Sequence, residues 1–287
     1  MLRFSERYAG WLAVLALVFI NAFIWFGPLA AQGSGMLTVS FLDVGQGDSI
    51  YIEGPTGSQI LVDGGTGPAV LRELGAVMQF HDRSIDVVVG THPDKDHIGG
   101  LSSVLSRYAV GYFVDPGLPN DTAAWRALEE TIAARGVERK TARRGMKIVL
   151  GGGATLDILF PDRDMTGADT NDASIVARLS FGDESFLLTG DSPKKIEEYL
   201  VRLDALSLES DVLKAGHHGS RTSTGETFLA AVHPAFAVIS SGKGNSYGHP
   251  HEEVLGILAH FGVRTMSTAK EGRITFKTDG KTIERVE

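Results

Sequence analysis

Six consecutive residues, His92-Pro93-Asp94-Lys95-Asp96-His97, contain four side chains that can bind divalent metal ions. They follow the apolar segment 85–89, which is typical of a buried strand. Asp191 and the pair His217-His218 come later, each again just after an apolar, strand-like run. Because ligands at strand ends can converge on one edge of a sheet, this pattern predicts a hydrolase with two metal ions.

The spacing within the first motif has a physical reason. The carboxylates of Asp94 and Asp96 would repel each other, and bound cations remove that repulsion. We expect His92 and Asp94 to face one cation, and Asp96 and His97 to face another. Two cations about 3.5–4 Å apart can clamp both the attacking and the leaving oxygen of a displacement reaction. A solvated polar turn is the alternative, but four ligand types in six positions are uncommon in such turns.

The composition limits the classes of site. The chain has 287 residues, of which 43% are hydrophobic and 22% charged, as in an ordinary globular protein. It contains no cysteine, so disulfides and thiolate metal sites are excluded and a metal must be held by imidazole and carboxylate. The formal net charge of -8 argues against a surface covered in basic residues for nucleic acid, although it leaves room for a local basic groove.

The N-terminal segment has the composition of a membrane anchor. No residue from Trp11 to Ala31 is charged, and a membrane-spanning helix needs about 20 apolar residues. Arg3 and Arg7 precede the run, so the positive-inside rule places the rest of the chain outside the membrane. A signal peptide cleaved near residues 29–31 is the alternative and would give a secreted protein. We therefore expect residues 1–35 to be an anchor or signal peptide with a linker, and residues 36–287 to be an exported hydrolase domain.

Strand and helix patterns alternate along the exported part. Alternating apolar residues predict an opening β-meander over 37–42, 49–53 and 59–62. The other predicted strands are 85–89, 110–114, 155–160, 174–181, 185–188, 211–215, 235–240, 264–267 and 273–277. The predicted helices are 68–79, 98–108, 122–135 with Asp121 as N-cap, 193–202, 226–232 and 252–261. Two such halves indicate an α/β (α+β) protein with two facing sheets and helices outside, a four-layer α-β-β-α arrangement.

The segment His92–His97 resembles the signature loop of the metallo-β-lactamase superfamily. More narrowly, the chain resembles the hydrolase domain of the ComEC family of DNA-uptake (competence) proteins, over about residues 37–277. The segments that carry this resemblance are 42–49, 61–65, 91–100, 171–174, 188–191, 213–220 and 247–251. The resemblance implies the four-layer metallo-β-lactamase sandwich, in agreement with the pattern of strands and helices.

The resemblance also implies a metal-ligand set. Asp191 would bridge two ions, and one of His217 and His218 would complete the second site, with His218 favoured. The implied ligands are His92, Asp94, Asp96, His97, Asp191 and His218. Asp94 and Asn171 stand where the wider superfamily has histidines, so the first site is rich in oxygen and favours Mn²⁺ over Zn²⁺.

Other residues are implied to assist these ligands. Asp63 would steer a ligand histidine through a hydrogen bond. The predicted catalytic residues are Asp96, His217 and His249, where one of the histidines contacts the phosphate or protonates the leaving oxygen. Ser220 is a candidate phosphate contact, although serines in such loops more often cap helices.

Two groups of charged residues have open interpretations. Asp43 and Asp48 either order a loop beside the metals or hold a turn. A basic cluster, diluted only by Glu138, is either a solvated edge or a track for the phosphates of a nucleic acid. Its members are Arg135, Arg139, Lys140, Arg143, Arg144 and Lys147.

We expect a membrane-anchored, extracytoplasmic phosphodiesterase or DNase with two divalent ions, Mn²⁺ or Zn²⁺. The resemblance implies DNA as substrate and degradation of the non-transported strand during DNA uptake. ComEC proteins carry many membrane spans, so a separate channel protein would be the partner. One alternative is a hydrolase of another substrate on the same scaffold, such as a cell-wall phosphodiester, a lactone or a β-lactam. The other is a protein that binds nucleic acid without cleaving it.

Overall fold

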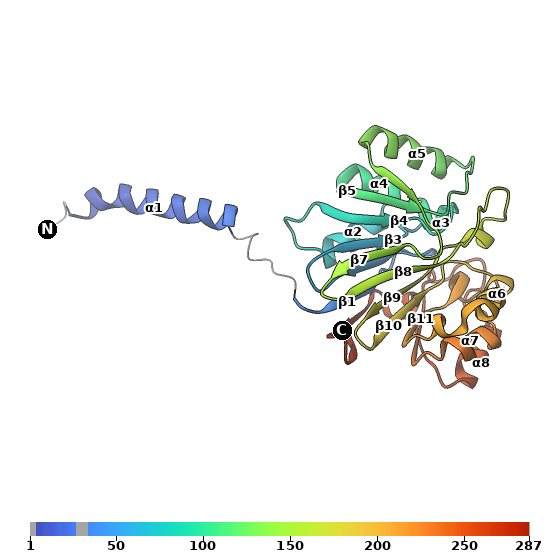
Figure 1. The fold of residues 1–287 in the computed structure, drawn as a ribbon. Coiled ribbons are helices and arrows are strands. Elements are labelled where there is room, and N and C mark those ends of the chain that lie inside the picture. The colour runs from blue at the N-terminus through green and yellow to red at the C-terminus, as the bar shows by residue number, and fades with distance from the viewer. Residues whose placement is uncertain (1–3, 27–33, 287) are drawn as a thin grey trace.

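The computed structural model describes residues 4–26 and 34–286 (Figure 1). The first range is helix α1 (Phe4–Phe26), whose side chains between Gly10 and Asn21 are exposed. No helix within the described ranges combines the length and the apolar character that crossing a membrane requires. The expected membrane-spanning helix is therefore not supported. Residues 27–31, which end the predicted span and include the alternative cleavage site, lie outside the described residues.

Two mixed sheets face each other (Figure 1). The eight-stranded sheet has the order β15-β14-β1-β2-β3-β4-β5-β6, and the seven-stranded sheet the order β13-β12-β11-β10-β9-β8-β7. The strands of the first are β1 (Leu37–Phe41), β2 (Ile50–Glu53), β3 (Gln59–Val62), β4 (Ser84–Val89), β5 (Ala109–Asp115), β6 (Glu138–Thr141), β14 (Ile274–Thr278) and β15 (Ile283–Val286). Those of the second are β7 (Lys147–Gly151), β8 (Ala154–Phe160), β9 (Val176–Phe181), β10 (Glu184–Leu188), β11 (Val212–Lys214), β12 (Phe236–Ile239) and β13 (Arg264–Ser267). The antiparallel pairing of β1, β2 and β3 is the predicted meander.

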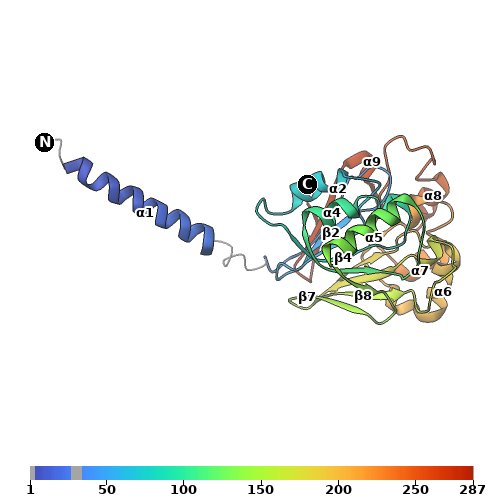
Figure 2. The ribbon, with the colours of Figure 1, turned by 90° about the horizontal axis from the view of Figure 1, so that it is seen from above.

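Helices cover the outer face of each sheet. Those on the first sheet are α2 (Ala69–Val77), α4 (Leu101–Arg107) and α5 (Ala123–Arg135), and Figure 2 shows them over β2 and β4. Those on the second are α6 (Lys194–Asp204), α7 (Glu226–Val232) and α8 (Glu252–His260). The fold also contains the short helices α3 (Lys95–Ile98) and α9 (Thr268–Glu271). The predicted four-layer arrangement is confirmed.

The buried apolar residues form three layers that match this arrangement. Between the sheets, the ring of Phe276 packs edge-on against Phe41 and Phe186, with centroids 6.2 Å and 6.0 Å apart. At its C-terminal end, Val87–Val89, strand β4 is continuously apolar because it is buried on both faces there. Val87 and Val89 point into the layer between the sheets, while Val88 points into the layer under the helices. Strands buried on both faces need apolar residues at every position.

The structure corrects three sequence predictions. The helix predicted over 98–108 is two helices, α3 and α4, that meet at Gly99-Gly100. A Cβ at Gly100 would lie 2.1 Å from the carbonyl oxygen of Gly64, so glycine permits this close packing. The N-cap of α5 is Thr122, whose Oγ1 accepts the N–H of Trp125 at 3.3 Å, rather than Asp121. Strands β6, β7 and β15 were not predicted, because their charged residues and glycines lack an alternating apolar pattern.

Candidate metal centre

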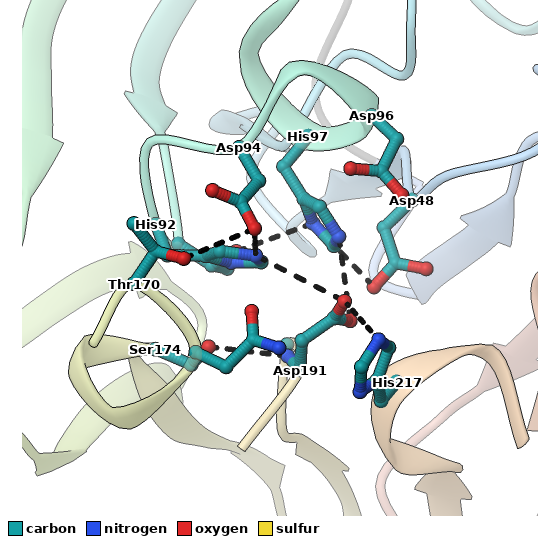
Figure 3. Close-up of polar contacts among 12 residues, drawn as sticks. Asp48, His92, Asp94, Asp96, His97, Thr170, Ser174, Asp191 and His217 are labelled. Carbon is teal, nitrogen blue, oxygen red and sulfur yellow. Dashed lines mark hydrogen bonds and ion pairs between the residues drawn. The ribbon is translucent and has the colours of Figure 1, made fainter. Parts of the chain in front are cut away.

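The predicted ligands converge at the ends of strands from both sheets (Figure 3). The segment 92–97 follows β4 and runs into helix α3, and Asp191 follows β10. The Nε2 atom of His97 lies 3.3 Å from Oδ1 of Asp191, and Nε2 of His92 lies 3.9 Å from Oδ2 of Asp191. Segments about a hundred residues apart in the sequence therefore meet within the reach of a shared cation.

Asp63 fixes the orientation of His97. Its Oδ2 lies 2.7 Å from Nδ1 of His97, and it also accepts hydrogen bonds from the N–H and the hydroxyl of Thr91 at 2.8 Å and 2.7 Å. The hydroxyl of Thr91 in turn lies 3.0 Å from Nδ1 of His92. With Nδ1 occupied on both rings, each Nε2 lone pair is directed at the centre, as in histidine ligands held by a carboxylate. The structure thus places Asp63 where the predicted role requires it.

His218 is held in the same way. Its Nδ1 lies 2.9 Å from the carbonyl oxygen of Ser240, to which it can donate. Its Nε2 lies 3.2 Å from Oδ2 of Asp96 and 3.4 Å from Oδ2 of Asp191. Asp191, Asp96 and His218 therefore share one region with His97, which is the predicted second site.

Asp94 and His92 lie on the opposite side of His97 from Asp96 (Figure 3). Oδ2 of Asp94 lies 3.7 Å from Nε2 of His92 and accepts a hydrogen bond from Thr170 at 3.1 Å. The next residue, Asn171, has a buried Oδ1 without a hydrogen-bond partner among the described residues. The structure thus brings together His92 and Asp94 of the predicted first site, and Asn171 follows directly on the Thr170 that contacts Asp94.

Several buried atoms here lack partners that a cation would provide. The unsatisfied atoms are Nε2 of His92, His97 and His218, Oδ1 of Asp191 and Oδ1 of Asn171. Leaving such a group unsatisfied costs about 1–3 kcal/mol. Ligand atoms from Asp48, His97, Asp191 and His218 all lie within 4.8 Å of one another. Imidazole nitrogens and carboxylate oxygens arranged in this way fit divalent cations.

The electrostatics of the centre support the same conclusion. Burial alone would lower the pKa of His97, but Asp191 and Asp63 outweigh it and raise that pKa well above its usual value. The pKa of His218 is raised in the same way by Asp191 and Asp48. Burial would raise the pKa of Asp191, yet these two histidines hold it well below its usual value. The carboxylates thus stabilise positive charge here, and a bound cation would displace the ring protons.

The sequence motifs do not predict a role for Lys214, and they leave two interpretations open for Asp48. The Lys214 ammonium is fully buried, forms an ion pair with Asp48, and donates to the carbonyl of Gly190 at 3.2 Å. The sequence feature that indicates a buried role for Lys214 is its position as the one charged residue within the apolar run Val212–Ala215. Asp43, by contrast, accepts the N–H of Gly45 at 3.3 Å and holds a turn.

A glycine lets the loop that carries Asp48 touch the 92–97 loop. The N–H of Asp48 donates to the carbonyl of Asp96 at 3.2 Å. Gly47 has a φ of 119°, and a Cβ there would lie 2.0 Å from that same oxygen. Only glycine tolerates both the backbone angle and the contact.

The adjacent histidines lie in a tight turn rather than in an extended segment. His217 and His218 have φ values of 48° and 56°, both left-handed. This turn directs both rings to Asp191, and Nε2 of His217 lies 3.6 Å from its Oδ2. The ring of His249 lies edge-on to that of His217, with centroids 5.6 Å apart. All three histidines therefore border the centre.

Ser220 is linked to the ring of His217 through the side chain of Thr222. Its Oγ accepts a hydrogen bond from the hydroxyl of Thr222 at 3.0 Å, and that hydroxyl lies 3.0 Å from Nδ1 of His217. The Ser220 side chain is buried. It is thus placed to position His217 through Thr222 rather than to meet a phosphate directly.

Most of the predicted basic cluster is engaged in ion pairs. Four of its six members have carboxylate partners: Arg139 with Asp115 and Glu129, Lys140 with Glu138, Arg144 with Asp204, and Lys147 with Asp157. Arg143 donates to the carbonyl of Pro116 at 2.9 Å. This arrangement favours the interpretation of a charged, solvated edge over that of a phosphate track.

Comparison with known proteins agrees with the fold. The family model described as the metallo-β-lactamase superfamily matches residues 42–243. Among solved structures, a metallo-hydrolase, Igni18, from Ignicoccus hospitalis has a TM-score of 0.54 at 14% identity, over 83% of this chain and 98% of that one. The metallo-β-lactamase fold protein YhfI of Bacillus subtilis has a TM-score of 0.55 at 12% identity, over 85% and 99%.

Curated relatives are longer proteins. "ComE operon protein 3" of Bacillus subtilis (strain 168) is 32% identical over 260 residues, which are 83% of this chain and 33% of that protein. "Competence protein ComA" of Neisseria gonorrhoeae is 31% identical over 262 residues, 91% of this chain and 35% of that protein. The chain thus spans about a third of the length of these relatives.

Proposed function

This chain belongs to the metallo-β-lactamase superfamily, and we propose that it is a metal-dependent phosphodiesterase that cleaves DNA. Members of the superfamily are generally metal-dependent hydrolases. The observation that carries the proposal is the position of Asp191. Its Oδ1 lies 3.3 Å from Nε2 of His97, and its Oδ2 lies 3.4 Å from Nε2 of His218 and 3.9 Å from Nε2 of His92, so this carboxylate adjoins histidines of both proposed cation positions.

The residues divide between two cation positions. His92, Asp94 and Asn171 would hold one ion, and Asp96, His97 and His218 the other, with Asp191 shared. Divalent ions bound there would supply Lewis acidity and a nucleophile at neutral pH. The oxygen-rich first position favours Mn²⁺ over Zn²⁺. The buried carboxylate of Asp63 holds His97 in the tautomer that leaves Nε2 free.

His249 and His217 border the place where a phosphate would bind. Burial and the charges of His218 and His217 lower the pKa of His249 to about 4, and burial also lowers the pKa of His217. Both rings are therefore neutral at pH 7 in this arrangement. A neutral ring with an N–H can donate a hydrogen bond to a phosphate oxygen or to the leaving oxygen, which assigns these residues to orienting the substrate.

The choice of DNA rests on the relatives with competence names. The test is incubation of the purified full chain with Mn²⁺ and single-stranded DNA, followed by gel analysis of the products. We expect cleavage that Asp191→Ala abolishes and that Asp183→Ala, a change at an exposed carboxylate, leaves intact. Hydrolysis of small phosphodiesters without DNA cleavage would reassign the substrate. Tight DNA binding without hydrolysis of either substrate would instead indicate a binding protein.

We also propose that the chain acts at the cell membrane, with the hydrolase part outside, beside a separate channel protein. The support is the uncharged run Trp11–Ala31 preceded by Arg3 and Arg7. Cell fractionation with protease treatment of intact cells tests this location. Recovery of the chain only from the soluble, protease-protected fraction would overturn it.

A further inference from the structure

An exposed aromatic ring stands at the edge of the metal centre. The side chain of Tyr247 is 65% exposed, although tyrosine rings usually bury most of their apolar surface. It stacks on His249 with centroids 5.6 Å apart and an interplanar angle of 21°. His249 in turn lies 5.6 Å from His217 and 6.2 Å from His218. One face of Tyr247 is thus supported by a ring of the centre.

The loop that carries Tyr247 is held by hydrogen bonds. Oδ1 of Asn245 accepts the N–H groups of Tyr247 and His249 at 3.2 Å and 3.0 Å. Its Nδ2 donates to the carbonyl oxygens of Gly242 and His249 at 3.0 Å and 2.6 Å. The N–H of Gly242 donates to the side chain of Gln46 at 3.1 Å, which joins this loop to the one that carries Asp48. These hydrogen bonds therefore fix the position of Tyr247.

The side chain of Arg221 extends the row of side chains that Tyr247 and His249 form at the edge of the metal centre. The ring of His251 lies 5.0 Å from that of His249. The guanidinium of Arg221 lies 3.4 Å from Nε2 of His251, and the N–H of Arg221 donates to Nδ1 of His251 at 3.2 Å. Among residues 34–286 no carboxylate forms an ion pair with Arg221. This contrasts with the basic cluster at 135–147, where most cations are already paired.

An exposed ring and an unneutralised cation beside a phosphodiesterase centre match the chemistry of a single nucleic-acid strand. Bases of a single strand stack on aromatic side chains whatever their identity, because every base has a π face, and basic side chains track the phosphates. In a duplex the bases are already stacked on one another. Tyr247 and Arg221 therefore favour binding of a single strand, and they do not distinguish one base from another.

We propose that Tyr247 stacks on the nucleobase next to the phosphodiester that is cleaved, and that Arg221 contacts a neighbouring phosphate. This inference rests on the proposed function and adds the form of its substrate. Tyr247 then contributes to binding of the strand and makes no contribution to the chemical step.

The experiment compares two single-stranded substrates with the same backbone. One is an oligothymidylate, and the other carries abasic tetrahydrofuran units in place of all nucleosides. With Mn²⁺ and the full chain, we expect KM for the oligothymidylate to be roughly ten-fold lower than for the abasic strand. Tyr247→Ala should remove that difference with little change in kcat, whereas Tyr247→Phe should retain it. Arg221→Gln should raise KM on both strands.

Phe80→Ala provides the matched control, because Phe80 is also an exposed aromatic residue, at 90%, but precedes the start of β4, at the opposite end of that strand from the 92–97 loop. It should change neither KM. An equal rise in KM on both strands in Tyr247→Ala would show a merely structural role and overturn the inference, as would wild-type protein that makes no distinction between them.

Fluorescence anisotropy with Ca²⁺ in place of Mn²⁺ separates this inference from the proposed function. Should wild-type protein cleave neither strand, the proposed hydrolysis fails. A preference for binding oligothymidylate over the abasic strand that Tyr247→Ala removes would still support the stacking role. Equal binding of both strands would then reject the stacking role as well.

Discussion

The ammonium of Lys214 and the carboxylate of Asp48 form an ion pair that is wholly enclosed by the protein. Asp48 also lies 3.2 Å from Nδ1 of His218 and 3.9 Å from Nδ1 of His97. Lys214 lies 3.9 Å from Oδ1 of Asp191. Burial would raise the pKa of Asp48, but Lys214 and His218 lower it. The carboxylate of Asp48 thus places a fixed negative charge behind the rings of His218 and His97, and the buried ammonium of Lys214 compensates that charge.

Removing one partner of this pair should be costly. In Lys214→Met the volume is nearly kept, but Asp48 remains as a buried carboxylate that has lost its ammonium partner, so we expect a destabilisation of about 3–5 kcal/mol. The measurement is urea unfolding followed by circular dichroism. Lys214→Met combined with Asp48→Asn removes both charges and should recover most of the loss. Equal stability of Lys214→Met and wild-type protein would show that the pair contributes nothing to the fold.

Replacing Asp63 should lower metal affinity more than it lowers the free energy of unfolding. In Asp63→Asn the amide can no longer serve as a charged acceptor for both Thr91 and His97, so the ring loses its fixed tautomer. We expect Mn²⁺ affinity to fall about 10- to 100-fold, as for other carboxylates behind ligand histidines. Isothermal titration calorimetry on the metal-free protein measures it, and Asp183→Asn is the exposed control. Unchanged affinity in Asp63→Asn would remove the positioning role.

The layers and the ligand loops were accessible from sequence because their signals are local. The buried end of β4, Val87–Val89, is continuously apolar, and four of the six residues in the segment 92–97 are metal ligands by chemical type. Their convergence also follows from simple topology, since parallel strands β10 and β11 deliver Asp191 and His218 to the same edge.

The features that sequence analysis missed depend on tertiary contacts. Lys214 gave a weak signal because a single lysine in a strand usually indicates an exposed position, and its partner Asp48 is 166 residues away. The orientation of His217 and His218 depends on left-handed backbone angles, which are uncommon outside glycine even though histidine adopts them more often than most residues. Strand β6 carries the charged sequence Glu138–Thr141, whose ion pairs with other segments replace an apolar pattern.

Gly47 should be intolerant of a side chain. In Gly47→Ala the new Cβ meets the carbonyl oxygen of Asp96 and the backbone is strained, so the loop that carries Asp48 must move. Gly57→Ala is a matched control, because Gly57 also has a positive φ, 88°, but its Cβ would meet nothing within 4 Å. We expect Gly47→Ala to lose about 1–3 kcal/mol more than Gly57→Ala in urea unfolding. Equal losses would show that strain alone, without the contact, sets the cost.

The buried carboxyl of Glu197 should make stability depend on pH. Its two oxygens accept the N–H groups of Thr224 at 2.6 Å and Gly225 at 2.9 Å, at the start of α7. Burial raises its pKa to about 7, although these hydrogen bonds oppose the shift. The folded state therefore favours the protonated carboxyl. Its contribution to stability is fully present below the ordinary pKa of 4.5 and is lost as the pH rises through about 7.

Glu197→Gln isolates this contribution. The amide never ionises but offers one acceptor oxygen instead of two, so the variant should be less stable than wild-type protein at pH 5 by on the order of 1–3 kcal/mol. Between pH 5 and pH 8 the wild-type free energy of unfolding should fall relative to the variant, and the gap should narrow by on the order of 2 kcal/mol. Urea unfolding at several pH values measures both the gap at pH 5 and its change with pH. Glu198→Gln is the control, because Glu198 is an exposed residue of α6, the helix that also carries Glu197. A gap that widens as the pH rises would mean that the carboxylate is the stabilised form, with the two backbone N–H donors outweighing burial.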